Sequence, residues 1–229
     1  LQGDWSSDMC SSDLIETPKV IGYVYKDGII DMIHEIEHDK KYLLKPDKGG
    51  RGQGISIFDP NNIPSDDDYL IQEKIDMSPI HHFRLITTTD DIVFVTLYLS
   101  NGKNIVSNGY VNGNEYIFQL ESDSTGSVNR NEQNLKIRNI LNQEYMDVNI
   151  FSKHVFGYPI EKQLERAIQK SIQAHKNICP FCDTIAWDLA ILKDDIYFFE
   201  GNIPGATIPK SDYLYFKKID TFKHKSKLF

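Results

Sequence analysis

Residues 187–202 read WDLAILKDDIYFFEGN, two apolar runs on either side of the polar segment KDD. This pattern predicts a β-hairpin whose turn is centred near Asp194. With that turn, Asp188 and Glu200 lie directly opposite each other on neighbouring strands, with Cα atoms about 4.5–5.5 Å apart. Asn202 follows Glu200 by two residues and therefore lies on the same face of its strand.

Both faces of this hairpin are otherwise apolar. We expect Trp187, Leu189, Ile191, Tyr197 and Phe199 on one face, and Ala190, Leu192, Ile196 and Phe198 on the other. Such a hairpin is expected to be buried, where two facing carboxylates repel each other unless a cation joins them. Two carboxylates and an amide oxygen are a hard ligand set suited to Mg²⁺, which takes its other ligands from water and nucleotide phosphates. The alternative is that the carboxylates lie at an exposed hairpin end and only solvate it.

A glycine-rich segment lies upstream, in residues 41–58, KYLLKPDKGGRGQGISIF. It is neither a Walker A loop nor a Rossmann turn, because no Gly-Lys-Ser/Thr follows and the next element is a strand. A glycine loop between two strands is instead a hairpin flap, whose backbone N–H groups can approach phosphates closely. Lys45 and Arg51 add positive charge there. The alternative is a mobile surface hairpin without a ligand.

The other apolar runs predict most of the remaining elements. We expect a hairpin over 19–33 around the KDG turn, strands over 69–76, 81–88 and 91–99, an exposed loop over 121–134 and an amphipathic helix over 160–175. Arg84 lies among apolar residues, and an arginine in such a strand usually pairs with a carboxylate unless an anion lies nearby. Many strands around one main helix predict an α+β fold with a largely antiparallel sheet.

Composition narrows the function classes. The chain has 229 residues, of which 40% are hydrophobic and 25% charged, and a formal net charge of −8. This charge argues against non-specific nucleic-acid binding, which needs a basic surface. No apolar run approaches the roughly 20 residues that span a bilayer. Three cysteines do not make a disulfide framework, so we expect a cytoplasmic protein.

In chain order, these segments resemble the ATP-grasp enzymes. The resemblance runs through Lys45-Pro46 and GGRGQG, then QEKI, then Arg84, and ends in Asp188, Glu200 and Asn202, a D-x11-E-x-N spacing. It covers about residues 16–210 and is closest to the sugar-transfer-associated and α-L-glutamate-ligase-like branch, whose sequences end in a similar WD-apolar…EGN string. It implies an ATP-grasp fold, in which two α+β subdomains grip ATP. Residues 15–75 would form part of the first subdomain, 76–212 the second, and 213–229 a basic tail.

The resemblance also implies roles for individual residues. Lys45 would contact the ATP phosphates, under a loop formed by Gly49, Gly50, Arg51, Gly52 and Gly54. The backbone around Glu73, Lys74 and Ile75 would hold the adenine edge, with Asp76 on the ribose. Arg84 would face the γ-phosphate, and Asp188, Glu200 and Asn202 would hold Mg²⁺.

The family mechanism that follows is ligation of a small-molecule carboxylate to a small-molecule amine. ATP phosphorylates the carboxylate, and the amine then displaces phosphate to form an amide, while Mg²⁺, Lys45 and Arg84 neutralise the phosphoryl charge. The branch implies work in cell-surface polysaccharide or peptide-conjugate synthesis. The alternatives with the same fold are an inactive or non-ligase ATP-binding module and a phosphotransferase that acts on an alcohol.

Two departures from the family pattern bear on activity. Related sequences often carry a second arginine on the strand after Arg84, where this chain offers Tyr98 or Ser100. An N-terminal domain with another ATP-contacting lysine usually precedes the glycine loop. Residues 4–14, DWSSDMCSSDL, resemble a translated sequencing adapter with Met9 in place of valine. We therefore expect residues 1–14 to be spurious, and the chain to be an inactive C-terminal portion of a longer protein.

Two short motifs suggest rival readings. HEIEH, residues 34–38, matches the zincin pattern, which needs a helix that holds both imidazoles on one face with Glu35 as the base. The flanking DG turn and strand leave little room for a helix, so we interpret the match as chance. CPFC, with Cys179 and Cys182, could be a redox pair or half of a zinc site, but buried structural thiols fit its apolar surroundings better.

Overall fold

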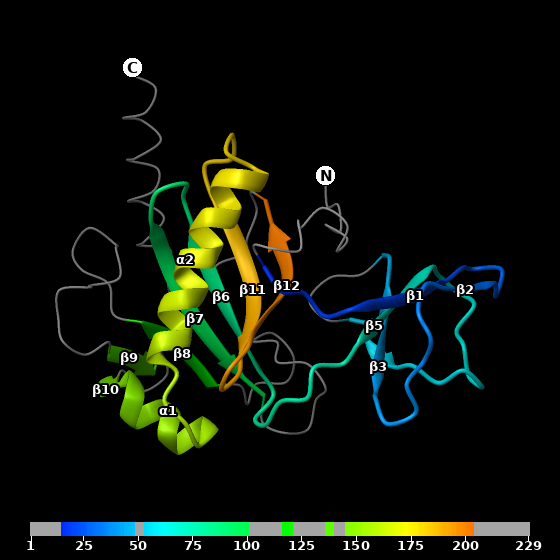
Figure 1. The fold of residues 1–229 in the computed structure, drawn as a ribbon, viewed down its shortest axis with the longest axis horizontal. Coiled ribbons are helices and arrows are strands. Elements are labelled where there is room, and N and C mark those ends of the chain that lie inside the picture. The colour runs from blue at the N-terminus through cyan, green and yellow to red at the C-terminus, as the bar shows by residue number, and fades with distance from the viewer. Residues whose placement is uncertain (1–14, 49–52, 101–115, 121–135, 140–144, 204–229) are drawn as a thin grey trace.

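The computed structural model describes residues 15–48, 53–100, 116–120, 136–139 and 145–203. These residues form two antiparallel β-sheets and two helices, which confirms the predicted α+β fold. Figure 1 shows the two sheets side by side, with the helices on the larger one only. The predictions made for residues 1–14, 121–134 and 213–229 concern segments outside the described residues.

The smaller sheet has five strands in the order β2-β1-β5-β3-β4. Their bounds are β1 Val20–Val24, β2 Ile30–Met32, β3 Tyr42–Pro46, β4 Ser56–Ile57 and β5 Tyr69–Glu73. The predicted KDG turn joins β1 to β2, and Gly28 adopts a φ of 83° there, a conformation that glycine accepts without strain. β3 and β4 pair across the glycine-rich segment, as expected. The sheet therefore presents that segment as a strand–loop–strand hairpin.

The larger sheet has seven strands in the order β10-β9-β8-β7-β6-β11-β12. Their bounds are β6 His81–Thr87, β7 Ile92–Leu99, β8 Tyr116–Leu120, β9 Lys136–Asn139, β10 Tyr145–Asp147, β11 Ile185–Ile191 and β12 Ile196–Asn202. β6 lies between β7 and β11, although about a hundred residues separate β6 from β11 in sequence. This order brings the hairpin of β11 and β12 beside the strand that carries Arg84.

Helix α2 (Glu161–Ile178) covers one face of the larger sheet (Figure 1). Its apolar stripe, including Leu164, Ala167 and Ile168, is buried as the periodicity predicted. The same core contains Phe83, Leu85, Val95, Leu97, Trp187, Leu189, Ile191 and Phe198 from the sheet. Because side chains alternate along a strand, Arg84 and Asp188 lie on the other face of the sheet.

Helix α1 (Val148–Phe156) was not predicted from the sequence. Asp147 caps its first turn by accepting hydrogen bonds from the N–H groups of Asn149 and Ile150. Gly157 ends it with a φ of 81°. The helix thus carries both terminal signals, and Phe151 and Phe156 anchor it in the core of the larger sheet.

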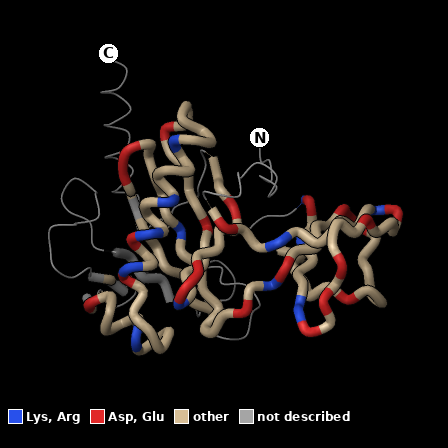
Figure 2. Tube along the Cα trace, viewed as in Figure 1, with Lys and Arg blue, Asp and Glu red and all other residues tan. Residues whose placement is uncertain are grey.

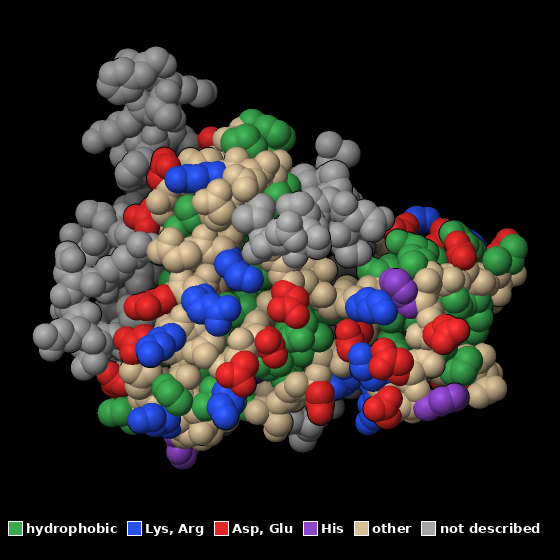
Figure 3. Space-filling view, viewed as in Figure 1, with side chains coloured by type: hydrophobic (Ala, Val, Ile, Leu, Met, Phe, Trp, Pro, Cys, Tyr) green, Lys and Arg blue, Asp and Glu red, His purple; other side chains and the backbone are tan. Residues whose placement is uncertain are grey.

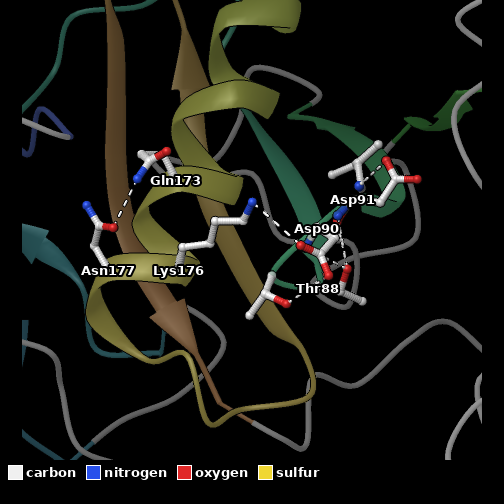
Figure 4. Close-up of polar contacts among 8 residues, drawn as sticks. Thr88, Asp90, Asp91, Gln173, Lys176 and Asn177 are labelled. Carbon is white, nitrogen blue, oxygen red and sulfur yellow. Dashed lines mark hydrogen bonds and ion pairs between the residues drawn. The ribbon is translucent and has the colours of Figure 1, made fainter. Parts of the chain in front are cut away.

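Polar contacts attach the turn between β6 and β7 to the last turns of α2 (Figure 4). Within the turn, the N–H groups of Asp90 and Asp91 donate to Thr88 Oγ1 over 3.3 and 3.0 Å. The ammonium of Lys176 lies 3.5 Å from Asp90 Oδ1. Both groups of this ion pair are well exposed, so the pair orients the turn and adds little stability.

The chain passes between the two sheets twice. Ile15 is buried in the core of the larger sheet, and Glu16 accepts a 2.7 Å hydrogen bond from the N–H of Phe198 before the chain enters β1. The chain returns after Glu73 and enters β6 at His81, whose ring contacts the carbonyl oxygens of Pro79 and Ile191 at 2.8 and 3.1 Å. These contacts join the second crossing to the larger sheet.

Acidic and basic residues are interspersed along both sheets (Figure 2). The face that α2 covers likewise mixes the two kinds of side chain, without one large patch of either sign (Figure 3). No helix in the described part of the chain is both long enough and apolar enough to cross a membrane.

Candidate functional site

Three charged residues form a row across β6, β11 and β12, the three strands at one edge of the larger sheet. Arg84 on β6 pairs with Asp188 on β11, and Asp188 pairs with Glu200 on β12. Cross-strand partners share a face, so all three side chains lie on the face that α2 does not cover. The predicted opposition of Asp188 and Glu200 is confirmed.

The register that produces this opposition differs from the predicted one near the turn. Ile191 pairs with Ile196 across a tight turn, and this register would place Asp188 opposite Phe199. An irregularity between the pairs of Asp188 and Leu189 adds one residue to β12, so that Glu200 meets Asp188. The β-bulge therefore restores the alignment that a wider turn was expected to give.

The predicted faces of β12 are wrong for the same reason. Ile196 and Phe198, not Tyr197 and Phe199, share the buried core with Trp187 and its neighbours on β11. The tighter turn shifts the pairing by one residue, and a shift of one residue exchanges the two faces of a strand.

Arg84 and Asp188 form a two-bond ion pair. Arg84 Nε donates to Asp188 Oδ1 over 2.7 Å, and a terminal nitrogen of Arg84 donates to Asp188 Oδ2 over 2.6 Å. Their side chains are 18% and 9% exposed. Burial opposes the charge of Arg84, but the hydrogen bonds and charge of Asp188 outweigh it and raise the pKa of Arg84 above its usual value. The pair thus matches the usual role of an arginine in such a strand.

Glu200 and Asn202 complete the polar group. Asn202 Nδ2 donates to Glu200 Oε1 over 3.0 Å and lies 3.5 Å from Asp188 Oδ2. Although Glu200 is exposed as a residue, desolvation and then the charge of Asp188 raise the pKa of its carboxyl group. The hydrogen bond from Asn202 and the positive charge of Lys45 act in the opposite direction.

This donor set fits a small hard cation. Asp188 and Glu200 supply carboxylate oxygens, and Asn202 would supply its amide oxygen by turning its side-chain amide over. Without a cation, the same amide orients its NH₂ group toward the carboxylates and reduces their repulsion. Among the residues that the structure describes, no group of three His, Cys, Asp or Glu side chains could hold a metal ion. A metal ion bound by Asp188 and Glu200 would therefore need the amide oxygen of Asn202 as its third protein ligand.

The smaller sheet carries other residues that were predicted to contact phosphates. Lys45 lies on β3, opposite Leu70 of β5, and its charge acts on Glu200 of the larger sheet. Gly54 has a φ of 76°, and a Cβ there would lie 2.9 Å from the ring of Pro46. Gly49, Gly50, Arg51 and Gly52 lie outside the described residues. Glu200 therefore interacts electrostatically with two cationic residues, Lys45 and Arg84.

The predicted adenine-binding segment lies where the chain leaves β5. The N–H groups of Glu73 and Lys74 donate to the carbonyl oxygens of Lys19 and Lys41 over 2.8 and 2.9 Å. An adenine edge would therefore have to use the carbonyl groups of this segment or the N–H of Ile75. Asp76 is exposed beyond it, 4.0 Å from the ammonium of Lys74.

The two acceptor-side positions, Tyr98 near the end of β7 and Ser100 just after it, are both buried. The ring of Tyr98 stacks on that of its cross-strand partner His82 with a centroid distance of 4.6 Å, on the face of the sheet that carries Arg84. The N–H of Ser100 donates to the carbonyl of Ile80 over 2.9 Å. Tyr98 is therefore the residue of this pair that belongs to the surroundings of Arg84.

The two rival motifs do not form the sites they suggested. His34 and His38 are exposed and lie in a non-helical connection between β2 and β3, so the zincin geometry is absent. Cys179 is buried at the end of α2, and burial, together with its contact to Cys182, raises the pKa of its thiol to about 11. A raised thiol pKa disfavours the reactive thiolate, as the structural interpretation expects.

No family model matches the chain, and no curated protein matches it. Among solved structures, D-alanine–D-alanine ligase from Bacillus anthracis is similar with a TM-score of 0.48 and 16% identity, over 93% of this chain and 62% of that one. L-amino acid ligase from Bacillus licheniformis has a TM-score of 0.48 and 10% identity, over 90% and 40% of the two chains. The ATP-grasp ligase PsnB, complexed with a phosphomimetic variant of a minimal precursor, Mg and ADP, has a TM-score of 0.41 and 10% identity, over 90% and 52%. This chain therefore spans less than two thirds of each of these proteins.

Proposed function

We propose that the chain carries the nucleotide and metal site of an ATP-grasp ligase, which joins a carboxylate to an amine through an acyl phosphate. The observation that carries this proposal is the row of Arg84, Asp188 and Glu200 on the face of the larger sheet opposite α2. Lys45 of the other sheet acts on the same row. Carboxylates beside two cationic side chains suit a ligand that is itself a metal–polyphosphate.

Asp188, Glu200 and Asn202 would hold the Mg²⁺ of this ligand. Two carboxylates and one amide leave coordination positions for phosphate oxygens and water, as Mg²⁺ sites in phosphoryl-transfer enzymes do. Bound there, Mg²⁺ would neutralise charge on the transferring phosphoryl group. Arg84 already compensates Asp188, which leaves the carboxylate of Glu200 to attract the cation.

The cationic residues would orient the phosphates. Lys45 and Arg84 come from different sheets, and we propose that ATP lies between them, under the glycine-rich loop. A substrate carboxylate oxygen attacks the γ-phosphorus, the bond to the β-phosphate oxygen breaks, and ADP leaves. An amine then attacks the acyl carbon, phosphate leaves, and the amine loses a proton. Lys45 and Arg84 stabilise the negative charge that is spread over the phosphoryl oxygens.

The substrates are small molecules in this proposal, one with a carboxylate and one with an amine. The ligases to which the chain is similar include two whose names give amino acids as substrates. Resemblance to the sugar-transfer-associated branch extends the proposal to cell-surface polysaccharide or peptide-conjugate synthesis in the cytoplasm.

Hydroxylamine tests the proposed chemistry, because it converts an acyl phosphate into a hydroxamate. The chain is incubated with Mg²⁺-ATP, hydroxylamine and a panel of amino acids, and both ADP and hydroxamate are measured. A hydroxamate that the Glu200→Gln variant fails to form, but Asp194→Asn still forms, supports the ligase. Asp194 is a suitable control because it is an exposed acid at the far end of the same hairpin.

The other outcomes identify the alternatives. ADP formed without hydroxamate, together with a phosphorylated alcohol, would indicate a phosphotransferase. ATP binding without ADP would indicate a nucleotide-binding module, or a chain that needs further residues for turnover.

A further inference from the structure

Gly201 lies between two of the proposed metal ligands, Glu200 and Asn202. Its cross-strand partner is Trp187 on β11. A Cβ at Gly201 would lie 2.9 Å from Cζ3 and 3.2 Å from Cε3 of the Trp187 ring. The indole therefore lies directly against the backbone of β12, on the core face of the sheet. The side chains of Glu200 and Asn202 extend toward the opposite face, so the ring supports their strand from behind.

A chain of buried hydrogen bonds holds the indole in place. Trp187 Nε1 donates to Thr87 Oγ1 over 3.0 Å, and Thr87 Oγ1 lies 3.0 Å from His175 Nδ1. His175 Nε2 lies 2.9 Å from the carbonyl oxygen of Cys182. Thr87 and His175 have no exposed surface, and Trp187 is 4% exposed. This network connects β6, β11 and the end of α2 behind the row of charged residues.

With a neutral imidazole, the donors and acceptors of this network allow one arrangement of protons. The carbonyl of Cys182 can only accept, so His175 Nε2 carries the proton and Nδ1 accepts. Thr87 then donates its hydroxyl proton to Nδ1 and uses its oxygen to accept from the indole. Every member is satisfied, and a buried polar network in this state favours one conformation of its side chains.

We infer that Thr87 and His175 are positioning residues, which act through Trp187 and Gly201 to set the spacing of Glu200 and Asn202 from Asp188, and so select Mg²⁺ over Ca²⁺. This inference rests on the proposed function, because it concerns the same cation. Mg²⁺ demands near-octahedral geometry at about 2.0–2.1 Å, whereas Ca²⁺ accepts longer and more variable distances. A firmly supported strand therefore favours Mg²⁺, and a loosened one loses that preference.

The test compares cation affinities in Thr87 variants of the full chain. Mn²⁺ with a non-hydrolysable ATP analogue is the probe, and its binding is followed by enhanced relaxation of water protons. Mg²⁺ or Ca²⁺ is then added to displace Mn²⁺. Thr87→Val removes the hydroxyl at nearly constant volume and should weaken Mg²⁺ about tenfold or more, as loss of a supporting contact does at other metal sites. Its effect on Ca²⁺ should be below about threefold, because Ca²⁺ tolerates altered geometry.

Two companion variants separate positioning from general damage to the core. Thr87→Ser keeps the hydroxyl and should recover most of the Mg²⁺ preference. Ser171→Ala removes another fully buried hydroxyl, which lies one turn before His175 in α2. The Ser171 hydroxyl donates to the carbonyl of Ala167 in the same helix and takes no part in the network. This variant should leave both affinities unchanged. Trp187→Phe, which lacks the indole N–H, gives an independent variant if Thr87→Val does not fold, and should also lose Mg²⁺ preference.

The outcomes distinguish failure of the positioning role of Thr87 and His175 from failure of the proposed function. A wild-type chain that does not bind the Mn²⁺ probe would contradict the proposed function and the inference together. A wild-type chain that binds, with Thr87→Val or Trp187→Phe folded and unchanged in its Mg²⁺ to Ca²⁺ affinity ratio, would overturn the inference alone. Thr87→Ser behaving like Thr87→Val would also overturn it, since the hydroxyl would then have no part.

Discussion

Asp188 and Arg84 depend on each other because each is largely shielded from water. The two hydrogen bonds between them satisfy most of the Asp188 carboxylate, and removal of one partner leaves a shielded charge without compensation. Asp188 is also a proposed metal ligand. A cation bound there could therefore compensate part of the Asp188 charge when Arg84 is removed, and this can be tested.

Arg84→Met should lower the free energy of unfolding by about 3 kcal/mol, the cost of breaking a buried ion pair from one side. Urea denaturation measures this change. Asp188→Asn in the same chain should recover much of the loss, and Mg²⁺ should stabilise Arg84→Met more than it stabilises the wild type. If Arg84→Met cost as much free energy of unfolding in the Asp188→Asn background as in the wild type, loss of the ion pair would not be the cause of the destabilisation.

Glu200→Gln should stabilise the fold at neutral pH. The pKa of Glu200 is raised in the folded state, so the folded chain holds this proton more tightly than the unfolded chain does. The stabilising contribution of the group is therefore complete below its unfolded pKa of about 4.3, and is lost as the pH rises through the folded pKa.

The gain from Glu200→Gln is expected to be at most about 1 kcal/mol at pH 7, because the residue is exposed and its interactions are screened. It should vanish near pH 4, where Glu200 is largely protonated in both states. Denaturation midpoints at the two pH values measure the difference. A variant that is less stable than wild type at pH 7 and equal at pH 4 would reverse the assigned direction of the pKa shift.

Gly201→Ala should destabilise the chain by about 1–3 kcal/mol, because the added methyl overlaps the indole of Trp187. The hydrogen bond from the indole to Thr87 restrains the ring from moving aside. In a Trp187→Leu background the same substitution should cost much less. A double-mutant cycle with thermal unfolding gives the coupling energy, and a value near zero would contradict direct contact.

At the scale of elements, the hairpin of β11 and β12 was predictable and helix α1 was not. The two apolar runs and the polar turn predicted the hairpin, and Asp188 meets Glu200 as predicted because the β-bulge offsets the misplaced turn. The β-bulge had no signal in the sequence, so the faces of β12 were assigned wrongly while the central pair was right. The contact between Arg84 and Asp188 depends on the order of strands from distant segments, which local patterns do not specify.

Helix α1 did carry a sequence signal that could have revealed it. Residues 147–157, DVNIFSKHVFG, begin with a favoured N-cap residue and end with a favoured C′ residue. The β-branched residues between these signals suit a strand as well as a short helix, which obscured the helical pattern. Packing of Phe151 and Phe156 into the core settles the choice in favour of the helix.

The cap of α1 offers a prediction with a closely matched control. Asp147→Ala should lower the free energy of unfolding by about 1 kcal/mol, because the N–H groups of Asn149 and Ile150 lose their acceptor. Asp147→Asn keeps a side-chain oxygen and should remain close to wild type. Urea denaturation distinguishes the two. Equal losses in both variants would assign the effect to the charge of Asp147 rather than to its hydrogen bonds.

At the scale of the whole molecule, the chain crosses between two sheets, and the proposed ATP site draws residues from both. Lys45 belongs to the smaller sheet, while Arg84, Asp188, Glu200 and Asn202 belong to the larger one. The influence of Lys45 on Glu200 connects the two sets of residues. We propose that together these residues bind ATP with Mg²⁺.

Calorimetric titration of the full chain with ATP, with and without Mg²⁺, tests this claim most directly. We predict ATP binding that requires Mg²⁺, is lost in an Asp188→Asn, Glu200→Gln double variant, and is kept in Asp194→Asn. Loss of the two carboxylates should remove binding through the metal. The double variant also loses the charge that compensates Arg84, so circular dichroism is used to verify that it is folded. ATP binding that is equally strong without Mg²⁺, or unchanged in the double variant, would contradict the account.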